Sequence, residues 1–196
     1  MVHGLWSIQK FSIFIVNRLA LRLPHLKIYN KQDILSVTRI RRFETKIGER
    51  VQVIKDGTSL ESALQQSSAP FVLLGIPEDI GVLANQGVGG CDSAWIAFLQ
   101  SFLNTQSNDF FEGSSILVLG HFDFSDAKNL IEQNAQSYDE KIAAYRHAVN
   151  MIDDEVEQLI HMITQNNKIP IVIGGGHNNA YPCIKGAAKG LYKAGL

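Results

Sequence analysis

The sequence has no excess of charge of one sign. Its 196 residues contain 18 Lys and Arg against 19 Asp and Glu, which gives a formal net charge of −1 at pH 7. Proteins that attract nucleic acid or an anionic membrane surface usually carry an excess of basic residues. The composition therefore predicts neither partner. Hydrophobic residues make up 45% of the chain, which is enough for one sizeable core and one domain.

Cysteine is scarce, and its spacing excludes the common metal motifs. Cys91 and Cys183 form no C-x-x-C pair and no zinc-ligand pattern. We expect both to be reduced in a cytoplasmic protein, with a disulfide between them as the alternative. The apolar run over residues 11–16 is far too short to cross a bilayer.

Acidic residues are absent from the start of the chain, before Asp33. The Lys and Arg residues within residues 1–28 are Lys10, Arg18, Arg22 and Lys27. Residues 15–23 are basic and amphipathic, as organelle transit peptides are. The simpler alternatives are a poorly ordered arm and an incorrect start site. We therefore assign residues 1–28 to an N-terminal arm of undetermined role and residues 29–196 to one domain.

Three short apolar runs, each closed by glycine, predict buried strands. They span residues 71–75, 115–120 and 169–174. Runs that are continuously apolar, without alternation, indicate a parallel sheet covered on both faces.

Helical patterns alternate with these strands. They span residues 60–66 after Thr58-Ser59, 94–103 after Asp92-Ser93, 139–166, and 181–194 before Gly195. The third has an apolar stripe from Ile142 to Ile163, and we expect Asp153, Asp154 and Glu155 to lie on its solvated face. The order predicts a three-layer α/β fold with a mostly parallel sheet, in which functional residues sit on loops at the carboxyl ends of strands.

The strongest candidate for chemistry follows the last strand, in the run Gly174-Gly175-Gly176-His177-Asn178-Asn179. Three successive glycines allow a sharp turn or a close approach to a ligand. We expect His177 to point into the crevice above the sheet, where imidazole is a common metal ligand. The alternative is a tight turn with an incidental histidine. Phosphate binding is poorly supported, because Asn179 stands where a dinucleotide fingerprint has Gly or Ala, and no Gly-Lys-Ser/Thr occurs.

A second glycine-rich loop follows the first strand. It runs from Gly75-Ile-Pro77-Glu78-Asp79-Ile-Gly81 through Asn85-Gln86-Gly87 to Gly89-Gly90. Long shaped loops at strand ends are often functional, and a plain solvent loop is the alternative.

Together these loops resemble the ureohydrolase family, which includes arginase, agmatinase and formimidoylglutamase. Its members have a strand leading into Gly-x-Pro-x-Asp-x-Gly and, further along, a strand followed by Gly-Gly-x-His. Here these motifs fall at residues 75–81 and 174–177. The form Gly-Gly-Gly-His-Asn-Asn-Ala-Tyr is most similar to formimidoylglutamase-like members. The resemblance covers residues 29–196 and implies an arginase-like fold.

The resemblance implies a manganese-dependent hydrolase that cleaves C–N bonds in small guanidino or formimino compounds. In the family two Mn²⁺ ions bridge a hydroxide that attacks the substrate carbon. His177 matches a ligand of one ion. Asn178, Asp79 and Asn85 lie in the loops that we assign to the substrate.

The other ligand motifs of the family, Asp-x-His-x-Asp and Ser-x-Asp-x-Asp-x-x-Asp, are absent. The nearest imitation, His121-Phe122-Asp123, follows the wrong strand, and we expect it to be a strand end with a helix cap. His3, His25, His147 and His161 are expected on the surface or on helix faces. Manganese needs several ligands, so we expect a fold incomplete at its C-terminus and no activity of this chain alone.

Two other interpretations remain open. One is a non-catalytic α/β remnant that acts as a binding or structural protein. The other, much weaker, is a nucleotide-binding α/β domain. If the strand at residues 169–174 lacks a neighbour, its free edge predicts self-association or a homo-oligomer.

Overall fold

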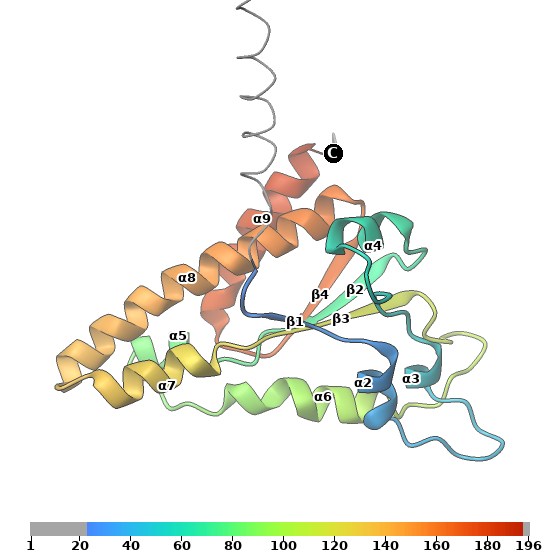
Figure 1. The fold of residues 1–196 in the computed structure, drawn as a ribbon, viewed down its shortest axis with the longest axis horizontal. Helices are drawn as coiled ribbons and strands as arrows, with labels where there is room; N and C mark the ends of the chain where they lie inside the picture. The colour runs from blue at the N-terminus through green and yellow to red at the C-terminus, as the bar shows by residue number, and fades with distance from the viewer. Residues whose placement is uncertain (1–22, 194–196) are drawn as a thin grey trace, which may run out of the picture.

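The computed structural model describes residues 23–193, and within them a four-stranded sheet forms the centre of an α/β domain (Figure 1). The strand order is β1 (Leu26–Ile28), β3 (Ile116–Phe122), β2 (Phe71–Gly75) and β4 (Ile169–Ile173). Strand β2 pairs in parallel with β3 and β4, whereas β1 pairs antiparallel with β3. The prediction of a mostly parallel sheet is therefore confirmed.

Helices lie on both faces of this sheet (Figure 1). Two short 3₁₀ helices, η1 (Cys91–Ser93) and η2 (His177–Asn179), precede α6 and α9. The α-helices are α2 (Lys31–Ser36), α3 (Ile47–Arg50), α4 (Leu60–Gln66), α5 (Ile80–Ala84), α6 (Ala94–Phe102), α7 (Ser125–Asn134), α8 (Tyr138–Gln165) and α9 (Ala180–Lys193).

The two faces of the sheet contribute to two separate hydrophobic cores. Val72 and Leu74 of β2 pack in the core that includes α4, α5 and α8. Leu73, between them, and Val118 of β3 pack in the core that includes α3 and α6. Successive strand side chains point to opposite faces, so a continuously apolar run places side chains in both cores. This explains why these strands lack alternation.

The buried face of α8 is wider than the predicted apolar stripe. The expectation that Asp153, Asp154 and Glu155 are solvated holds for Asp154 and is wrong for Glu155, which is 5% exposed. Asp153 is half-buried, so the expectation holds for it only in part. The Glu155 carboxylate lies 2.6 Å from Nδ1 of His25, a residue that precedes β1 and lies on no helix. The stripe did not reveal this contact because the segment before β1 packs on a second side of α8.

Helix α9 packs on α8 through its glycines. A Cβ at Gly186 would lie 2.5 Å from the carbonyl oxygen of Glu157, and one at Gly190 would meet the Thr164 side chain. The small residues therefore allow a close helix–helix contact. The opposite side of α9 exposes Tyr181, Ile184 and Leu191. The predicted end of this helix, at residues 194 and 195, lies outside the described residues.

Several boundaries differ from the sequence predictions. Strand β3 continues to Phe122, two residues beyond the predicted end. Residues 91–93 form η1, and Ser93 makes no side-chain cap for α6. The second glycine-rich loop contains helix α5. Residues 26–28, assigned to the N-terminal arm, form β1, while residues 1–22 of that arm lie outside the described part of the chain.

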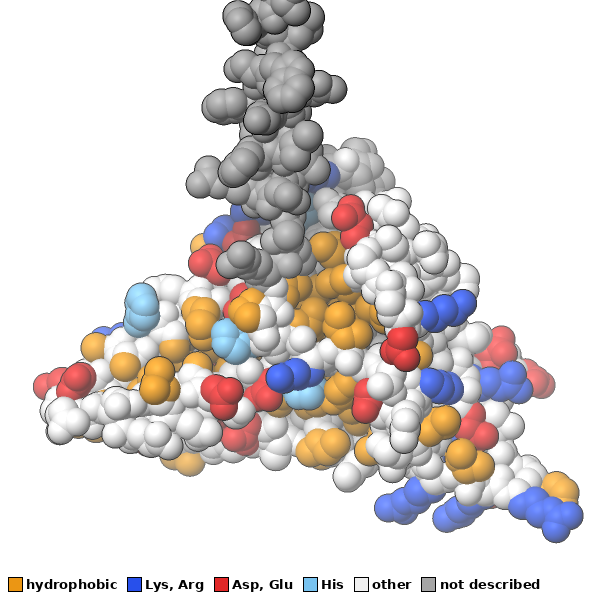
Figure 2. Space-filling view, viewed as in Figure 1, with side chains coloured by type: hydrophobic (Ala, Val, Ile, Leu, Met, Phe, Trp, Pro, Cys, Tyr) orange, Lys and Arg blue, Asp and Glu red, His pale blue; other side chains and the backbone are white. Residues whose placement is uncertain are grey.

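A groove of about 750 Å³ lies beside β1, α4 and α8. Its apolar lining includes Leu26, Ile28, Leu60 and Met162. Figure 2 shows apolar side chains gathered in this region, between charged side chains of the neighbouring helices. No helix within residues 23–193 is long and apolar enough to cross a membrane.

Candidate functional site

The parallel register brings three strand ends to one edge of the sheet. Gly75 of β2 stands opposite His121 of β3 on one side and Ile173 of β4 on the other. The segments after these strands lead into α5, α7 and η2. In an open α/β sheet this edge is where ligands bind. Both predicted loops therefore lie at the position that the fold favours for a site.

The backbone shape of the turn after β4 requires glycine. Gly174 and Gly175 have φ angles of 90° and 81°, which side chains other than glycine rarely adopt. A Cβ at Gly175 would also lie 2.5 Å from the carbonyl oxygen of Ile76, in the segment after β2. The turn therefore presses against the neighbouring loop. It ends at His177, the first residue of η2, whose side chain is exposed.

Glu78 connects the two glycine-rich loops. Its carboxylate is buried, with the residue 3% exposed. Oε1 accepts hydrogen bonds from the Gly176 amide at 3.2 Å and from Nδ2 of Asn179 at 2.6 Å. Oε2 accepts one from the Gly81 amide at 3.1 Å. One side chain thus contacts α5 and the turn that precedes His177.

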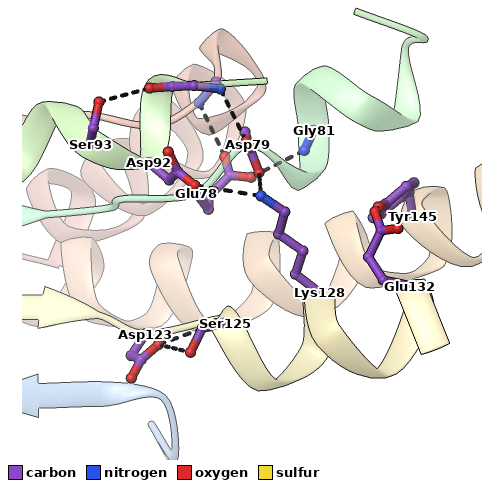
Figure 3. Close-up of polar contacts among 12 residues, drawn as sticks. Glu78, Asp79, Gly81, Asp92, Ser93, Asp123, Ser125, Lys128, Glu132 and Tyr145 are labelled. Carbon is purple, nitrogen blue, oxygen red and sulfur yellow. Dashed lines mark hydrogen bonds and ion pairs between the residues drawn. The ribbon is translucent and has the colours of Figure 1, made fainter. Parts of the chain in front are cut away.

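Asp79, the next residue, points to a different neighbour (Figure 3). Its Oδ1 lies 2.7 Å from the Lys128 ammonium of α7, and its Oδ2 accepts a hydrogen bond from the Gly90 amide at 3.1 Å. Lys128 also lies 3.5 Å from Asp92. The hydrogen bond to Asp79 raises the pKa of Lys128 above its usual value. Asp79, predicted in a substrate loop, therefore fixes the long loop to α7 in this structure.

The two asparagines that we assigned to the substrate loops, Asn178 and Asn85, lie in different surroundings. Nδ2 of Asn178 is 3.4 Å from Glu78, and its Oδ1 is buried near Gly81 without a hydrogen-bond partner among the described residues. Asn85 is exposed at the C-terminal end of α5. Asn178 thus belongs to the contact between the loops, whereas Asn85 lies on the surface of the second one.

His121 and Asp123 lie at the end of β3. The His121 ring contacts Tyr29 edge-on, with 5.4 Å between ring centroids, and burial lowers the pKa of His121. Asp123 accepts hydrogen bonds from the Ser125 amide and hydroxyl, and the side-chain bond lowers the pKa of Asp123. Asp123 therefore bonds to the first residue of α7, but it is not the cap of that helix, because the N-cap is Phe124, which makes no side-chain capping bond.

The described residues do not fit a binuclear manganese centre. Across residues 23–193, no group of three or more His, Cys, Asp or Glu side chains is placed to hold a metal ion. His177 is exposed, and the carboxylates of Glu78 and Asp79, in the loop after β2, are engaged by N–H groups and by Lys128. A resident metal would need donors that these residues do not supply.

A comparison with known protein families supports the resemblance that the two loops suggested. The profile of the arginase family matches residues 69–196, from just before β2 through α9. The chain belongs to the arginase family. This membership supports a hydrolase of the ureohydrolase type, and members of the family generally use Mn²⁺. The match is not specific to formimidoylglutamase. No curated protein and no solved structure matches the chain.

The arginase-family match begins after residues 29–68, which the sequence resemblance had included. Two residues that organise the site, Glu78 and Lys128, were not singled out from the sequence. Glu78 was visible only as the variable position of Gly-x-Pro-x-Asp-x-Gly, and Lys128 had no motif at all. No sequence signal marked the contact of Glu78 with the glycine-rich turn, because it depends on the pairing of β2 with β4.

Proposed function

We propose that this arginase-family chain belongs to a manganese-dependent hydrolase of C–N bonds in guanidino or formimino compounds, with formimidoylglutamate as its substrate class. The observation that supports the proposal is the direct contact between the two family loops. The Glu78 carboxylate bonds the turn that precedes His177, so both loops meet at the carboxyl edge of the sheet. A small substrate bound at this edge would contact both.

The choice of a formimino substrate rests on Asn178 and Asn179, which follow His177. Asn179 is 5% exposed and is held by Glu78 and by the Gly176 carbonyl, so its amide shapes the loop. Asn178 has a buried amide oxygen with no partner among residues 23–193. That oxygen lies against Gly81 and Gly176, so an N–H group of a formimino or guanidino substrate would reach it only if the two loops move apart.

The manganese centre of the proposed enzyme needs ligands besides His177. We infer that they come from polypeptide other than residues 23–193, either further sequence or a second chain. We also propose that the protein acts in the cytoplasm and self-associates, which the exposed apolar side chains of α9 support.

Manganese binding tests the proposal. Calorimetry on the purified chain should show weak Mn²⁺ binding, with a Kd well above about 1 μM, because one imidazole does not make a complete site. In NMR spectra, paramagnetic Mn²⁺ should broaden the His177 ring signals first. His147, another exposed histidine, serves as the matched control. Equal broadening of both would contradict a role for His177, and submicromolar binding lost in His177→Ala would contradict an incomplete site.

The alternative is a non-catalytic α/β protein that keeps the fold and binds partners. The observation that favours it is the lack of a three-residue metal cluster within residues 23–193. The same NMR experiment separates the two, because a non-catalytic remnant should show no preference of Mn²⁺ for His177. Addition of formimidoylglutamate should then leave the Asn178 side-chain signals unchanged, whereas the proposed enzyme should show them shifted.

A further inference from the structure

The Glu78 carboxylate has an unusual set of partners for a buried charge. Oε1 accepts hydrogen bonds from the Gly176 amide and from the side-chain amides of Asn178 and Asn179, at 3.2, 3.4 and 2.6 Å. Oε2 accepts a bond from the Gly81 amide at 3.1 Å. Both oxygens are therefore bound, and the donors come from two loops that are distant in the sequence.

No positively charged side chain among residues 23–193 forms an ion pair with Glu78. Lys128, which lies in the same region, pairs with Asp79 and Asp92 instead. The buried charge of Glu78 is thus balanced by N–H groups alone. Hydrogen bonds to a charged acceptor are stronger and more directional than neutral ones, so this carboxylate fixes the positions of its donors.

Three of the four donors belong to the segment that contains His177. The Gly176 amide is adjacent to His177 in the chain, and Asn178 and Asn179 complete η2 with it. The preceding glycines have positive φ angles and provide no side chain that could hold the turn. Glu78 is therefore the side chain that fixes this turn from outside.

We propose that Glu78 is a positioning residue, which holds η2 against the loop after β2 and so sets the place of His177. The proposal rests on the proposed function in taking His177 as a functional residue. Glu78 acts on His177 through its hydrogen bonds with Gly176, Asn178 and Asn179. The adjacent Asp79 has a separate task, since its partners lie in α7 and in the long loop.

The proposal can be tested by NMR with Glu78→Ala and Glu78→Gln in the full chain. In Glu78→Ala the Gly176 amide should exchange with solvent about tenfold faster or more, because its acceptor is lost. The His177 amide should lose order, with its order parameter falling from about 0.85 toward 0.6. Glu78→Gln keeps one acceptor oxygen and should restore part of both properties.

The matched control is Glu157→Gln. Glu157 is another buried carboxylate, 8% exposed, but its partners are Lys185 and Lys189 of α9. This variant should leave Gly176 exchange and His177 order unchanged, so a general loss of stability is separated from loss of positioning. If Glu78→Ala does not fold, Asn179→Ala removes the shortest of the bonds and should affect the same two amides to a smaller extent.

The outcomes distinguish this inference from the proposed function. If Glu78→Ala, or Asn179→Ala in its place, changes Gly176 and His177 no more than Glu157→Gln does, the positioning role is overturned. If both amides respond and Glu78→Gln restores them, the role is supported even when Mn²⁺ shows no preference for His177. In that case only the proposed function fails.

Discussion

The Lys128 ammonium lies 2.7 Å from the Asp79 carboxylate, and this ion pair joins helix α7 to the loop after β2 (Figure 3). Asp79 is 3% exposed, so its charge has little access to water. Removing one partner of a buried pair leaves the other charge uncompensated. The Lys128 side chain is 30% exposed, so the cost should be somewhat below that of a fully buried pair. We expect Lys128→Met to lower the free energy of unfolding by about 2–4 kcal/mol, measured by urea denaturation.

The control for this prediction is Lys141→Met. Lys141 pairs with Glu132, and both side chains are about one third exposed, at 33% and 39%. Exposed pairs contribute about 0–1 kcal/mol, so this variant should unfold close to the wild-type midpoint. If both variants lose the same stability, the Asp79–Lys128 pair has no special role in fixing the loop.

The fold was largely predictable from the sequence, since hydrophobic periodicity reports burial directly. Strand β2 and helix α4 begin and end at the predicted residues, and Ser59 accepts the capping hydrogen bond from the Ser62 amide. Strand β1 was missed because three residues are too few for a pattern. Its conformation depends on pairing with β3, which no local signal reveals.

The site was predictable only in its loops. Successive glycines mark the turn before His177 because few other residues adopt its φ angles. The partners of Glu78 are 98 and 101 residues away at Gly176 and Asn179, so its role depends on how the strands are paired. The burial of Glu155 was missed for the same reason, because its partner His25 lies 130 residues away.

Cys183 should make stability fall in alkaline solution. Burial raises the pKa of the Cys183 thiol to about 11, from an ordinary value of 9.0. Between these values the unfolded chain loses the thiol proton while the folded chain keeps it. The contribution of the neutral Cys183 thiol to the free energy of unfolding is therefore fully present below about pH 9 and is lost as pH rises toward 11. Urea denaturation from pH 8 to pH 10 should show this decline.

The decline should become shallower in Cys183→Ala, and Cys91→Ala is the control. Cys91 is less buried, although burial also raises the pKa of its thiol. The pKa values of Tyr29, Lys128, Tyr145 and Lys185 are raised as well, but from ordinary values of 10.0 or 10.5, so their contributions are lost mainly above pH 10. If the free energy of unfolding of Cys183→Ala declines with pH as steeply as that of the wild type, the fold does not hold the thiol in its neutral form.

Catalysis by the chain alone should be undetectable. Residues 23–193 contain no cluster of three potential metal ligands, and hydrolysis of a guanidino or formimino group needs strong charge stabilisation. We expect no release of product from formimidoylglutamate, arginine or agmatine with added Mn²⁺, measured against a metal-only blank. Turnover above the blank that is lost in His177→Ala would show that the missing ligands are supplied, for instance by a second copy.

The outer surfaces of β4 and α9 predict self-association. Within the described residues β4 pairs only with β2, so its other edge has free N–H and C=O groups, and such an edge pairs readily with another chain. On α9, Tyr181, Ile184 and Leu191 are 59%, 70% and 43% exposed, and their spacing places them along one side of the helix. An apolar stripe of this kind is stabilised by contact with a second apolar surface. Sedimentation velocity should therefore show oligomers that grow with concentration.

Substitution of Ile184 tests whether α9 is part of that contact. Lysine at this position places a charge in the centre of the stripe and removes an apolar side chain, so Ile184→Lys should weaken association about tenfold or more. Ile40→Lys is the matched control, because Ile40 is 61% exposed in the segment between α2 and α3, away from α9 in Figure 1. Equal effects of the two variants would indicate non-specific apolar contact. If the wild-type chain is a monodisperse monomer at all concentrations, self-association is excluded. The free edge of β4 and the apolar stripe of α9 would then both be stable in water.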